Sequence, residues 1–210
     1  MCTHYLAYCG LAAISNGCAG VTRALRKHEL PFYCNHLLRL RRQCRRSRFG
    51  NEVSDRFLQD YVGCIDLTNT AILGSFDGDE MRGAAELRSM RSVWCDAAEA
   101  AFSVEAQWRS RGIGGTLMMD TLAMSHGLGV ERVHLICERH NLAMLRIAEK
   151  VCADIRFEDG DCLSQITVPQ PQSQEDPGPY FAAFSGVPSN NSATLPHRGS
   201  HSSRRLEGCN

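Results

Sequence analysis

The sequence predicts an α/β fold with a mixed β-sheet, and three observations support this prediction. Apolar segments of strand length and of helix length follow one another between residues 21 and 168. A Gly-rich turn at residues 109–116 joins a short strand to an amphipathic helix. The chain has 210 residues, 43% of them hydrophobic, which is enough to bury one sizeable core but short for two. We therefore expect one α/β domain with additional terminal segments.

The first half of the domain is predicted to hold a strand, two helices and a β-hairpin. Residues 21–25 form the strand, and residues 36–46 form a helix that carries leucines among arginines. Ser54 is the expected N-cap of a second helix that ends at Gly63. The hairpin pairs residues 71–76 with residues 81–87 around the turn Asp77-Gly78-Asp79.

The second half is predicted to alternate strands with helices. A strand at residues 99–104 leads through the Gly-rich turn into a helix that stops at Gly127 or Gly129. A strand at residues 133–137 follows, and Asn141 opens the next helix. Residues 163–168 close the domain as its last strand.

Composition sets the expected boundaries of the domain. Six of the 7 prolines lie between Pro169 and Pro196, in a stretch rich in Ser, Asn, Gln and Gly that has no apolar periodicity. We expect residues 169–210 to be a disordered tail and residues 1–19 to be a poorly defined N-terminal extension. The folded domain is then residues 20–168.

Charge and cysteine usage bound the partners and the location. Lys+Arg and Asp+Glu both number 23, so the net charge gives no reason to expect a nucleic acid or an anionic membrane as partner. The 11 cysteines show no C-x-x-C spacing, which favours free thiols over a zinc or redox site. No secretory signal and no apolar run of about 18 residues is found. We expect a cytoplasmic protein that binds no metal and does not enter a membrane.

The Gly-rich turn Arg109-Ser110-Arg111-Gly112-Ile113-Gly114-Gly115-Thr116 is typical of an anion site. Unpaired N–H groups at the start of a helix, together with the helix dipole, favour negative charge, and a pyrophosphate fits such a turn. A dinucleotide fingerprint fails because Leu117 stands where the third Gly is needed. A P-loop fails because no Gly-Lys-Ser/Thr follows. A Gly-rich loop without a ligand remains open.

Residues 99–153 resemble the cofactor-binding half of the GNAT acyltransferase superfamily in order, spacing and residue type. Its signature maps onto Val104 at the strand end, onto Arg109, Gly112 and Gly114 in the turn, and onto Asn141 at the second helix. Residues 39–87 look similar to the helices and hairpin that precede this half. The stretch Ala98–Phe102 and Trp108 are similar to the catalytic domain of bacterial protein lysine acetyltransferases. The resemblance implies a mostly antiparallel central sheet with helices on both faces.

The resemblance also implies acetyl-CoA as the acyl donor and direct transfer of its acetyl group to a primary amine of a small molecule or a protein lysine. A homodimer is left open. The backbone N–H of Val104 is the implied donor to the oxyanion. The implied acetyl-CoA contacts are Phe102, Ser103, Val104, Arg109, Arg111, Gly112, Ile113, Gly114, Gly115, Thr116 and Asn141.

An attacking amine must be neutral, and free alkylamines have a pKa of about 10.4, so a carboxylate base helps. Glu99 is the candidate base. An equal alternative is that Glu99 only faces solvent on its strand, in which case Glu86 on the neighbouring predicted strand could serve as the base instead. Many GNAT members carry a Tyr acid on the last helix and a Gly-Phe after it. Here these positions hold Ala148 and then Cys152-Ala153. The missing Tyr leaves a non-catalytic acyl-CoA-binding module as the alternative function.

Other polar residues are interpreted as structural. The arginines near residues 39–48 are interpreted as a charged helix face. His134 and His140 lack a second ligand at metal spacing, Cys137 is expected in the core, and Trp108 is expected to pack against the turn.

Overall fold

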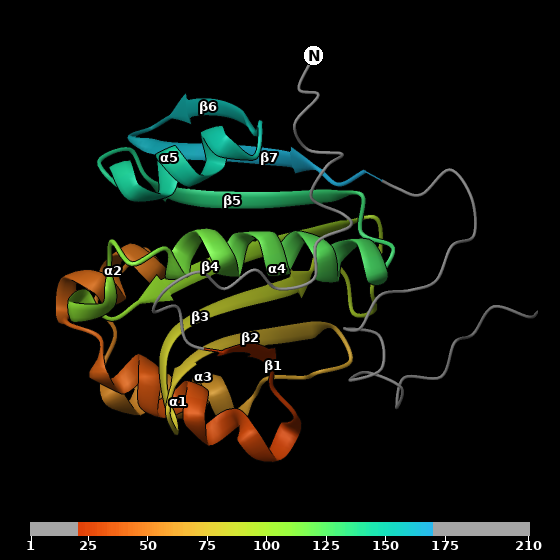
Figure 1. The fold of residues 1–210 in the computed structure, drawn as a ribbon. Helices are drawn as coiled ribbons and strands as arrows, with labels where there is room; N and C mark the ends of the chain where they lie inside the picture. The colour runs from red at the N-terminus through yellow and green to blue at the C-terminus, as the bar shows by residue number, and fades with distance from the viewer. Residues whose placement is uncertain (1–20, 170–210) are drawn as a thin grey trace, which may run out of the picture.

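The computed structural model describes residues 21–169, and within them the chain forms a seven-stranded sheet in the order β1-β2-β3-β4-β5-β7-β6 (Figure 1). The strands are β1 Val21–Ala24, β2 Thr70–Asp77, β3 Glu80–Ser89, β4 Ala97–Val104, β5 Arg132–Glu138, β6 Asp154–Glu158 and β7 Asp161–Thr167. The α-helices are α1 Leu30–Arg39, α2 Arg42–Phe49, α3 Asp55–Gly63, α4 Ile113–Gly127 and α5 Leu142–Lys150, and two short 3-10 helices are η1 Lys27–Glu29 and η2 Ala106–Trp108.

All neighbouring strands are antiparallel except β4 and β5, which run parallel. Their pairing covers only residues 97–99 of β4 and residues 132–134 of β5. Beyond Glu99 and His134 both strands continue without pairing to one another. The sheet therefore opens in its middle, between the C-terminal parts of β4 and β5.

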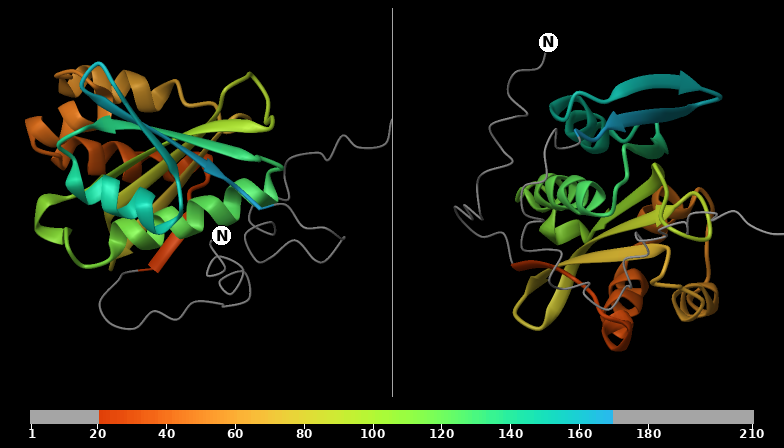
Figure 2. Two further views of the ribbon diagram at one scale, coloured as in Figure 1. Left: turned by 90° about the horizontal axis from the view of Figure 1, so that it is seen from above. Right: turned by 90° about the vertical axis from the view of Figure 1, so that its right-hand side faces the viewer.

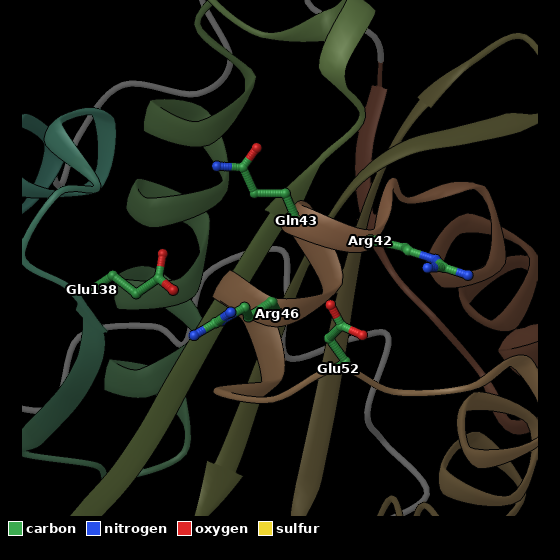
Figure 3. Close-up of a pocket in the computed structure, with 5 residues that line it drawn as sticks. All are labelled: Arg42, Gln43, Arg46, Glu52 and Glu138. Carbon is green, nitrogen blue, oxygen red and sulfur yellow. The ribbon is translucent and has the colours of Figure 1, made fainter.

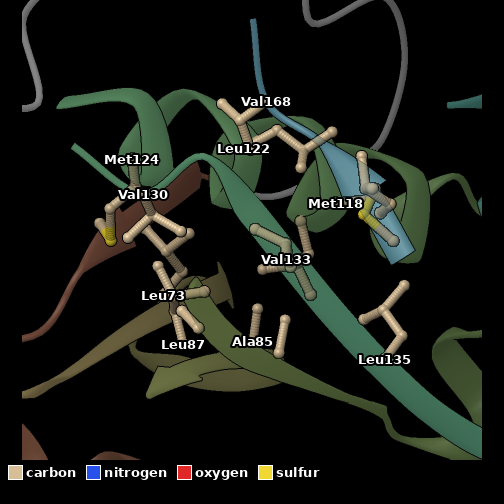
Figure 4. Packing of buried hydrophobic residues seen from close by; sticks show 14 of the residues in the cluster. Leu73, Ala85, Leu87, Met118, Leu122, Met124, Val130, Val133, Leu135 and Val168 are labelled. Carbon is tan, nitrogen blue, oxygen red and sulfur yellow. The ribbon is translucent and has the colours of Figure 1, made fainter. Parts of the chain in front are cut away.

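The helices cover both faces of the sheet, as Figure 2 shows. On one face α4 packs on β2, β3 and β4 and contacts α5. The core beneath it joins side chains of α4, such as Met118 and Leu122, to Val133 and Leu135 of β5 (Figure 4). On the other face α1 and α3 pack on one another and bury Leu37 and Leu58 against Ile72. The predicted α/β fold with helices on both faces is confirmed.

Helix α4 begins and ends at glycines in the left-handed conformation. Gly112 is its N-cap with φ 86°, and Gly129, just after the C-cap Leu128, has φ 73°. The predicted end of this helix is confirmed. Two predicted N-caps are confirmed as well, because the Ser54 hydroxyl accepts from Phe57 N–H at 3.1 Å and the Asn141 amide oxygen accepts from Met144 N–H at 3.2 Å.

The predicted helix at residues 36–46 is wrong, because the chain breaks there into α1 and α2. Leu40 adopts an extended conformation and its side chain is buried. The Arg45 guanidinium donates to the carbonyls of Leu38 at 2.6 Å and Leu40 at 3.0 Å. These bonds satisfy carbonyls at the end of α1 that the helix leaves without a partner, so the break is stabilised from the next helix.

Strand β6 was not predicted from the sequence, although it forms a hairpin with β7 over the turn Asp159-Gly160. It is an edge strand, and its charged residues Asp154, Arg156 and Glu158 obscure its apolar alternation. Charged side chains on an edge strand oppose pairing with other chains.

The predicted terminal segments, residues 1–19 and 169–210, lie outside the described residues apart from Pro169. Of the helices between residues 21 and 169, none combines the length and apolar character that a bilayer-spanning helix needs. The cytoplasmic location remains a prediction.

Candidate active site

The candidate site is the opening between β4 and β5. Residues 100–104 of β4 and residues 135–138 of β5 are not paired with each other, so the facing strand edges present backbone groups to the opening. Helix α2 contacts both strands beside this opening, on the face opposite α4. Unpaired strand edges offer a ligand the same hydrogen bonds that a missing strand would make.

The N–H of Val104 points into this opening. The N–H of the next residue, Glu105, donates to the Arg82 carbonyl beside β3 at 3.0 Å. N–H groups alternate between the two sides of a strand, so the Val104 N–H lies on the β5 side. The Val104 carbonyl is already bound, because Arg109 Nε donates to it at 3.2 Å. The strand end therefore offers a backbone donor at a fixed position.

The start of α4 lies directly after β4 and η2, beside the same opening (Figure 1). Its first backbone hydrogen bond runs from Thr116 N–H to Gly112 C=O at 3.0 Å. The helix itself supplies no acceptor for the N–H groups before Thr116, which are left for an anion. Among the first four helical residues, only Ile113 is buried, so its contribution to an anion site is confined to its backbone.

The three glycines of the turn have different physical roles. Gly112 is needed for its left-handed backbone, and a Cβ there would meet no atom within 4 Å. A Cβ on Gly114 would lie 3.1 Å from Ile147, so this glycine allows α4 to approach α5 closely. Gly115 faces open space. Open space above Gly112 and Gly115 is compatible with a ligand close to the backbone.

The arginines of the turn are engaged with the protein. Besides the Val104 carbonyl, Arg109 contacts Cys44 of α2, with its Nη2 3.1 Å from the Cys44 sulfur. Arg111 lies over the Trp108 ring, with its guanidinium carbon 4.6 Å from the ring centre. The contact with Arg111 joins Trp108 to the turn, as predicted, and the ring also packs against the core. Arg109 thus links the turn to α2 and holds the end of β4.

The remaining predicted contacts lie around the opening in different orientations. Phe102 packs toward the α4 core, whereas the Ser103 side chain points to the α1 side. Asn141 is close to the end of β5, but its amide oxygen is engaged as the N-cap of α5. Thr116 is exposed on the first turn of α4. Their contacts with a ligand stay predictions.

The two candidate carboxylates have opposite environments. Glu99 is exposed and occupies the last β4 position that pairs with β5, at the point where the strands separate. Glu86 is only 4% exposed and fully bonded. It accepts hydrogen bonds from Tyr33 at 2.8 Å, Tyr61 at 2.6 Å and Arg48 at 2.9 Å. Of the two carboxylates, only Glu99 is therefore exposed to solvent.

A second buried polar cluster lies at the end of β4 and was not predicted from the sequence. His36 of α1 is 2.9 Å through Nε2 from the Ser103 hydroxyl and 3.4 Å through Nδ1 from a Glu105 oxygen. Glu105 also binds Arg39 at 2.8 Å and Arg82 at 3.2 Å. No local pattern could reveal this cluster, because its members are brought together by the packing of α1 on the sheet.

A polar hollow of about 460 Å³ adjoins the opening and is lined by Arg42, Gln43, Arg46, Glu52 and Glu138. Figure 3 shows Arg46 on α2 and Glu138 at the end of β5 on facing sides, while Arg42 points away across α2. Ser47 of α2 donates to Glu138 at 2.8 Å and so ties α2 to the end of β5. The arginine-rich helix α2 thus lies next to the opening. In the sequence, its arginines indicate only a charged helix face and not this position.

Ala148, at the position where the resemblance places a Tyr acid, is buried on α5 with 1% of its surface exposed. Cys137 is buried as predicted, and its burial and the neighbouring Cys162 raise its pKa to about 12, so it remains a neutral thiol. Among residues 21–169, no group of three or more His, Cys, Asp or Glu side chains is placed to hold a metal ion.

The described fold agrees with comparisons to known proteins. The model of the acetyltransferase (GNAT) family matches residues 34–153, which is more than half of the chain. The chain therefore belongs to the GNAT acetyltransferase family, and acetyl transfer is its class of activity. A comparison with curated protein sequences found no significant match.

Solved structures of GNAT proteins share the fold. The GNAT domain of S. lividans PAT is 16% identical, with a TM-score of 0.60 over 70% of this chain and 89% of that chain. The putative acetyltransferase yncA from Salmonella typhimurium, solved with its cofactor acetyl-CoA, is 14% identical, with a TM-score of 0.54 over 74% and 97%. The ribosomal-protein-S18-alanine N-acetyltransferase from Escherichia coli is 13% identical, with a TM-score of 0.55 over 74% and 98%.

Proposed function

We propose that this protein transfers the acetyl group of acetyl-CoA directly to a primary amine, either of a small molecule or of a protein lysine. The observation that carries the proposal is the opening between β4 and β5, with an unpaired Val104 N–H on one side and the open start of α4 beside it. A long ligand with a pyrophosphate at one end and a thioester at the other matches these two features. The acetyl-CoA complex of the similar Salmonella protein supports this donor.

The pyrophosphate binds at the start of α4, where the N–H groups before Thr116 and the helix dipole favour negative charge. Gly112 and Gly115 leave space for its oxygens near the backbone. The pantetheine arm lies along the unpaired edges of β4 and β5, past Phe102 and Asn141. The thioester oxygen then accepts a hydrogen bond from the Val104 N–H, which stabilises the charge that develops during attack.

The amine arrives from the α1 and α2 side of the sheet. Glu99, exposed at the point where the strands separate, takes a proton through water from the ammonium form of the amine. The neutral amine attacks the carbonyl carbon, the carbon–sulfur bond breaks, and CoA leaves as the thiolate. The polar hollow beside α2, which holds both arginines and carboxylates, suits a polar acceptor.

The first test is the thermal unfolding midpoint of the full chain with and without acetyl-CoA, with NAD and ATP as controls. At a hundredfold excess over Kd a ligand adds about 2.7 kcal/mol, which raises the midpoint of a chain of this size by roughly 5–10 °C. A rise with acetyl-CoA alone supports the donor. No rise with acetyl-CoA, or an equal rise with all three compounds, contradicts the proposal.

The second candidate is a GNAT-like module that binds acyl-CoA without turnover, and the buried Ala148 on α5 favours it. Glu99→Gln separates the enzyme from the binding module, because only the enzyme has a turnover rate to lose. The affinity for acetyl-CoA should stay intact in both cases. In the enzyme the substitution should lower turnover by about 10²-fold or more. Turnover is measured as CoA release with free lysine, a lysine peptide and a polyamine as acceptors. Binding without release from any acceptor favours the module.

A further inference from the structure

The buried cluster at the end of β4 has the connectivity of a proton relay. Ser103 Oγ lies 2.9 Å from His36 Nε2, and His36 Nδ1 lies 3.4 Å from Glu105 Oε1. The exposed fractions of these side chains are 9% for Ser103, 0% for His36 and 2% for Glu105. A hydroxyl, an imidazole and a carboxylate in this order form the arrangement in which the imidazole accepts the hydroxyl proton and the carboxylate stabilises the resulting cation.

Its position relates the relay to the proposed oxyanion donor. Ser103 precedes Val104, the last residue of β4, and Glu105 follows it with its N–H bonded to the Arg82 carbonyl, so the backbone of both residues is fixed at this strand end. The side chain of Ser103 points to the α1 side, which is the side from which the amine is proposed to arrive. An amine nitrogen that attacks a thioester held by the Val104 N–H therefore approaches on the side of the sheet where the Ser103 hydroxyl lies.

His36 Nδ1 is a buried atom with no hydrogen-bond partner of good geometry among the described residues. The Glu105 oxygen lies 3.4 Å from this atom. Buried polar atoms of proteins rarely lack partners, and catalytic hydrogen bonds are often long before substrate binds. Nδ1 is thus placed to carry the proton that faces Glu105, which leaves Nε2 as the acceptor toward Ser103.

The charges around the imidazole are fixed by three elements. Glu105 follows β4, Arg39 lies one turn along α1 from His36, and Arg82 on β3 binds the far oxygen of Glu105. Burial lowers the pKa of His36, although Glu105 opposes this change, so the imidazole is neutral near pH 7. Burial alone would raise the pKa of Glu105, but the neighbouring His36 imidazole and the hydrogen bond from Arg39 bring it to about 2. Glu105 is therefore a permanent carboxylate.

We propose that Ser103, His36 and Glu105 form the proton relay of the acetyl transfer, with Ser103 as the group that touches the reacting amine and His36 as the proton store. This inference rests on the proposed function. It also supplies the proton donor that Ala148 in α5 cannot provide.

The protonated amine first gives one proton to Glu99, and the neutral nitrogen then forms a bond to the thioester carbon. The nitrogen now carries one proton too many, and this second proton passes to Ser103 Oγ while the Ser103 proton passes to His36 Nε2. The carbon–sulfur bond breaks, and its electron pair leaves on the CoA sulfur. His36 returns its proton through Ser103 to this thiolate. A thiol has a pKa of about 8.5, well above that of an imidazolium whose pKa is lowered by burial, so the return of the proton to the thiolate is favourable.

The first experiment determines the protonated nitrogen of His36 by nitrogen-15 NMR on the full chain, without any ligand. The imidazole signals that disappear from the spectrum of the His36→Gln variant are assigned to His36. The relay requires a neutral ring with its proton on Nδ1. A proton on Nε2, which would donate to Ser103, overturns the relay.

The second experiment measures CoA release from acetyl-CoA by chromatography, with a peptide that contains one lysine as the probe acceptor and with water as the second acceptor. Ser103→Ala and His36→Gln should lower kcat by about 10²-fold or more. Their KM for acetyl-CoA and its Kd should change less than about threefold, because neither side chain is needed for the pyrophosphate contacts. Ser103→Thr, which keeps the hydroxyl, should recover at least half of the lost activity.

Ser125→Ala is the matched control, because it removes a buried hydroxyl that bonds only to its own helix, at Thr121 C=O. Its kcat should equal that of the unmodified protein. An acid limb in the pH profile of kcat should vanish in His36→Gln, whereas a purely structural role of the cluster would leave it in place.

The outcomes separate the two proposals. If acetyl-CoA neither binds nor releases CoA with either acceptor, the proposed function fails and the relay fails with it. If acetyl-CoA binds and CoA is released, but Ser103→Ala is as fast as the unmodified protein, only the relay fails. Acetylated Ser103, detected by mass spectrometry during turnover, also overturns the relay, because it would make Ser103 a nucleophile.

Discussion

The two faces of the sheet bury different chemistry. Beneath α4, the core is apolar, and the buried hydroxyls of Thr121 and Ser125 bond to carbonyls one turn earlier in their own helix. Beneath α1 and α3, the core surrounds buried charges, among them Glu86 and Glu105. Their partners lie on other elements, so the polar groups of this face hold the elements together.

The difference shows how one sheet can carry an apolar face that holds α4 in place and a polar face on which the reaction is proposed to occur. Apolar contacts do not depend on precise directions. They hold α4 against the sheet with the unpaired N–H groups of its first turn beside the opening. Charged networks are directional and costly when incomplete, so they fix α1, α2 and β4 in one register. We therefore expect changes on the two faces to differ in cause as well as in size.

The largest effect is expected from Glu86→Ala on the polar face. This change leaves the buried Arg48 guanidinium without its carboxylate and should lower the free energy of unfolding by about 3–5 kcal/mol. Urea unfolding followed by circular dichroism measures it. Glu99→Ala, which removes an exposed carboxylate, should change stability by less than about 0.5 kcal/mol. Equal losses for both variants would show that burial of Glu86 is not decisive.

On the apolar face, Leu117→Ala should cost about 2–5 kcal/mol, because Leu117 is fully buried between α4 and the sheet. The loss comes from a cavity, so it should be nearly independent of pH between 4 and 8. The same urea titrations at several pH values check this. A pH-dependent loss would mean that the two faces are coupled.

Acidification should weaken the polar face selectively. The pKa of Glu105 is about 2 in the folded chain against an ordinary value of 4.5, so its contribution of about 3 kcal/mol is complete above pH 4.5 and is lost as the pH falls toward 2. The lowered pKa of His36 acts in the same direction, because the unfolded chain binds a proton more readily below pH 6.5.

Glu105→Gln should therefore be less stable than the unmodified chain at pH 7 but should lose less stability below pH 4.5. Urea midpoints at pH 7, 5, 4 and 3 test this. Parallel curves for the two proteins would rule out Glu105 as the titrating group.

The smallest effect is expected at the turn that joins the two faces. Gly112→Ala should cost about 1–2 kcal/mol, because φ 86° disfavours a Cβ although no atom would clash with it. Gly115→Ala, at an ordinary helical φ and also facing open space, should be neutral or stabilising by up to about 1 kcal/mol. Thermal unfolding without ligand compares the two, and equal shifts would contradict the role of the left-handed backbone.

Local sequence signals accounted for helix α4 and for the N-caps of α3 and α5. The spacing of Ile113, Leu117 and Met124 predicted α4, and the turn glycines predicted both of its ends. The N-cap residues Ser54 and Asn141 were also predicted, because capping involves residues only three positions apart. These interactions lie within one or two helical turns, where a single sequence is informative.

The sequence by itself determined the order of strands and helices, apart from β6 and the division between α1 and α2, and it determined the Gly-rich turn and the family. Only the tertiary structure decided the break at Leu40, the end of β4–β5 pairing at Glu99, and the meeting of His36 with Ser103 and Glu105. His36 and Ser103 are 67 positions apart. Their contact depends on the strand register and on the packing of α1, and no local propensity or periodicity encodes a distance of that kind.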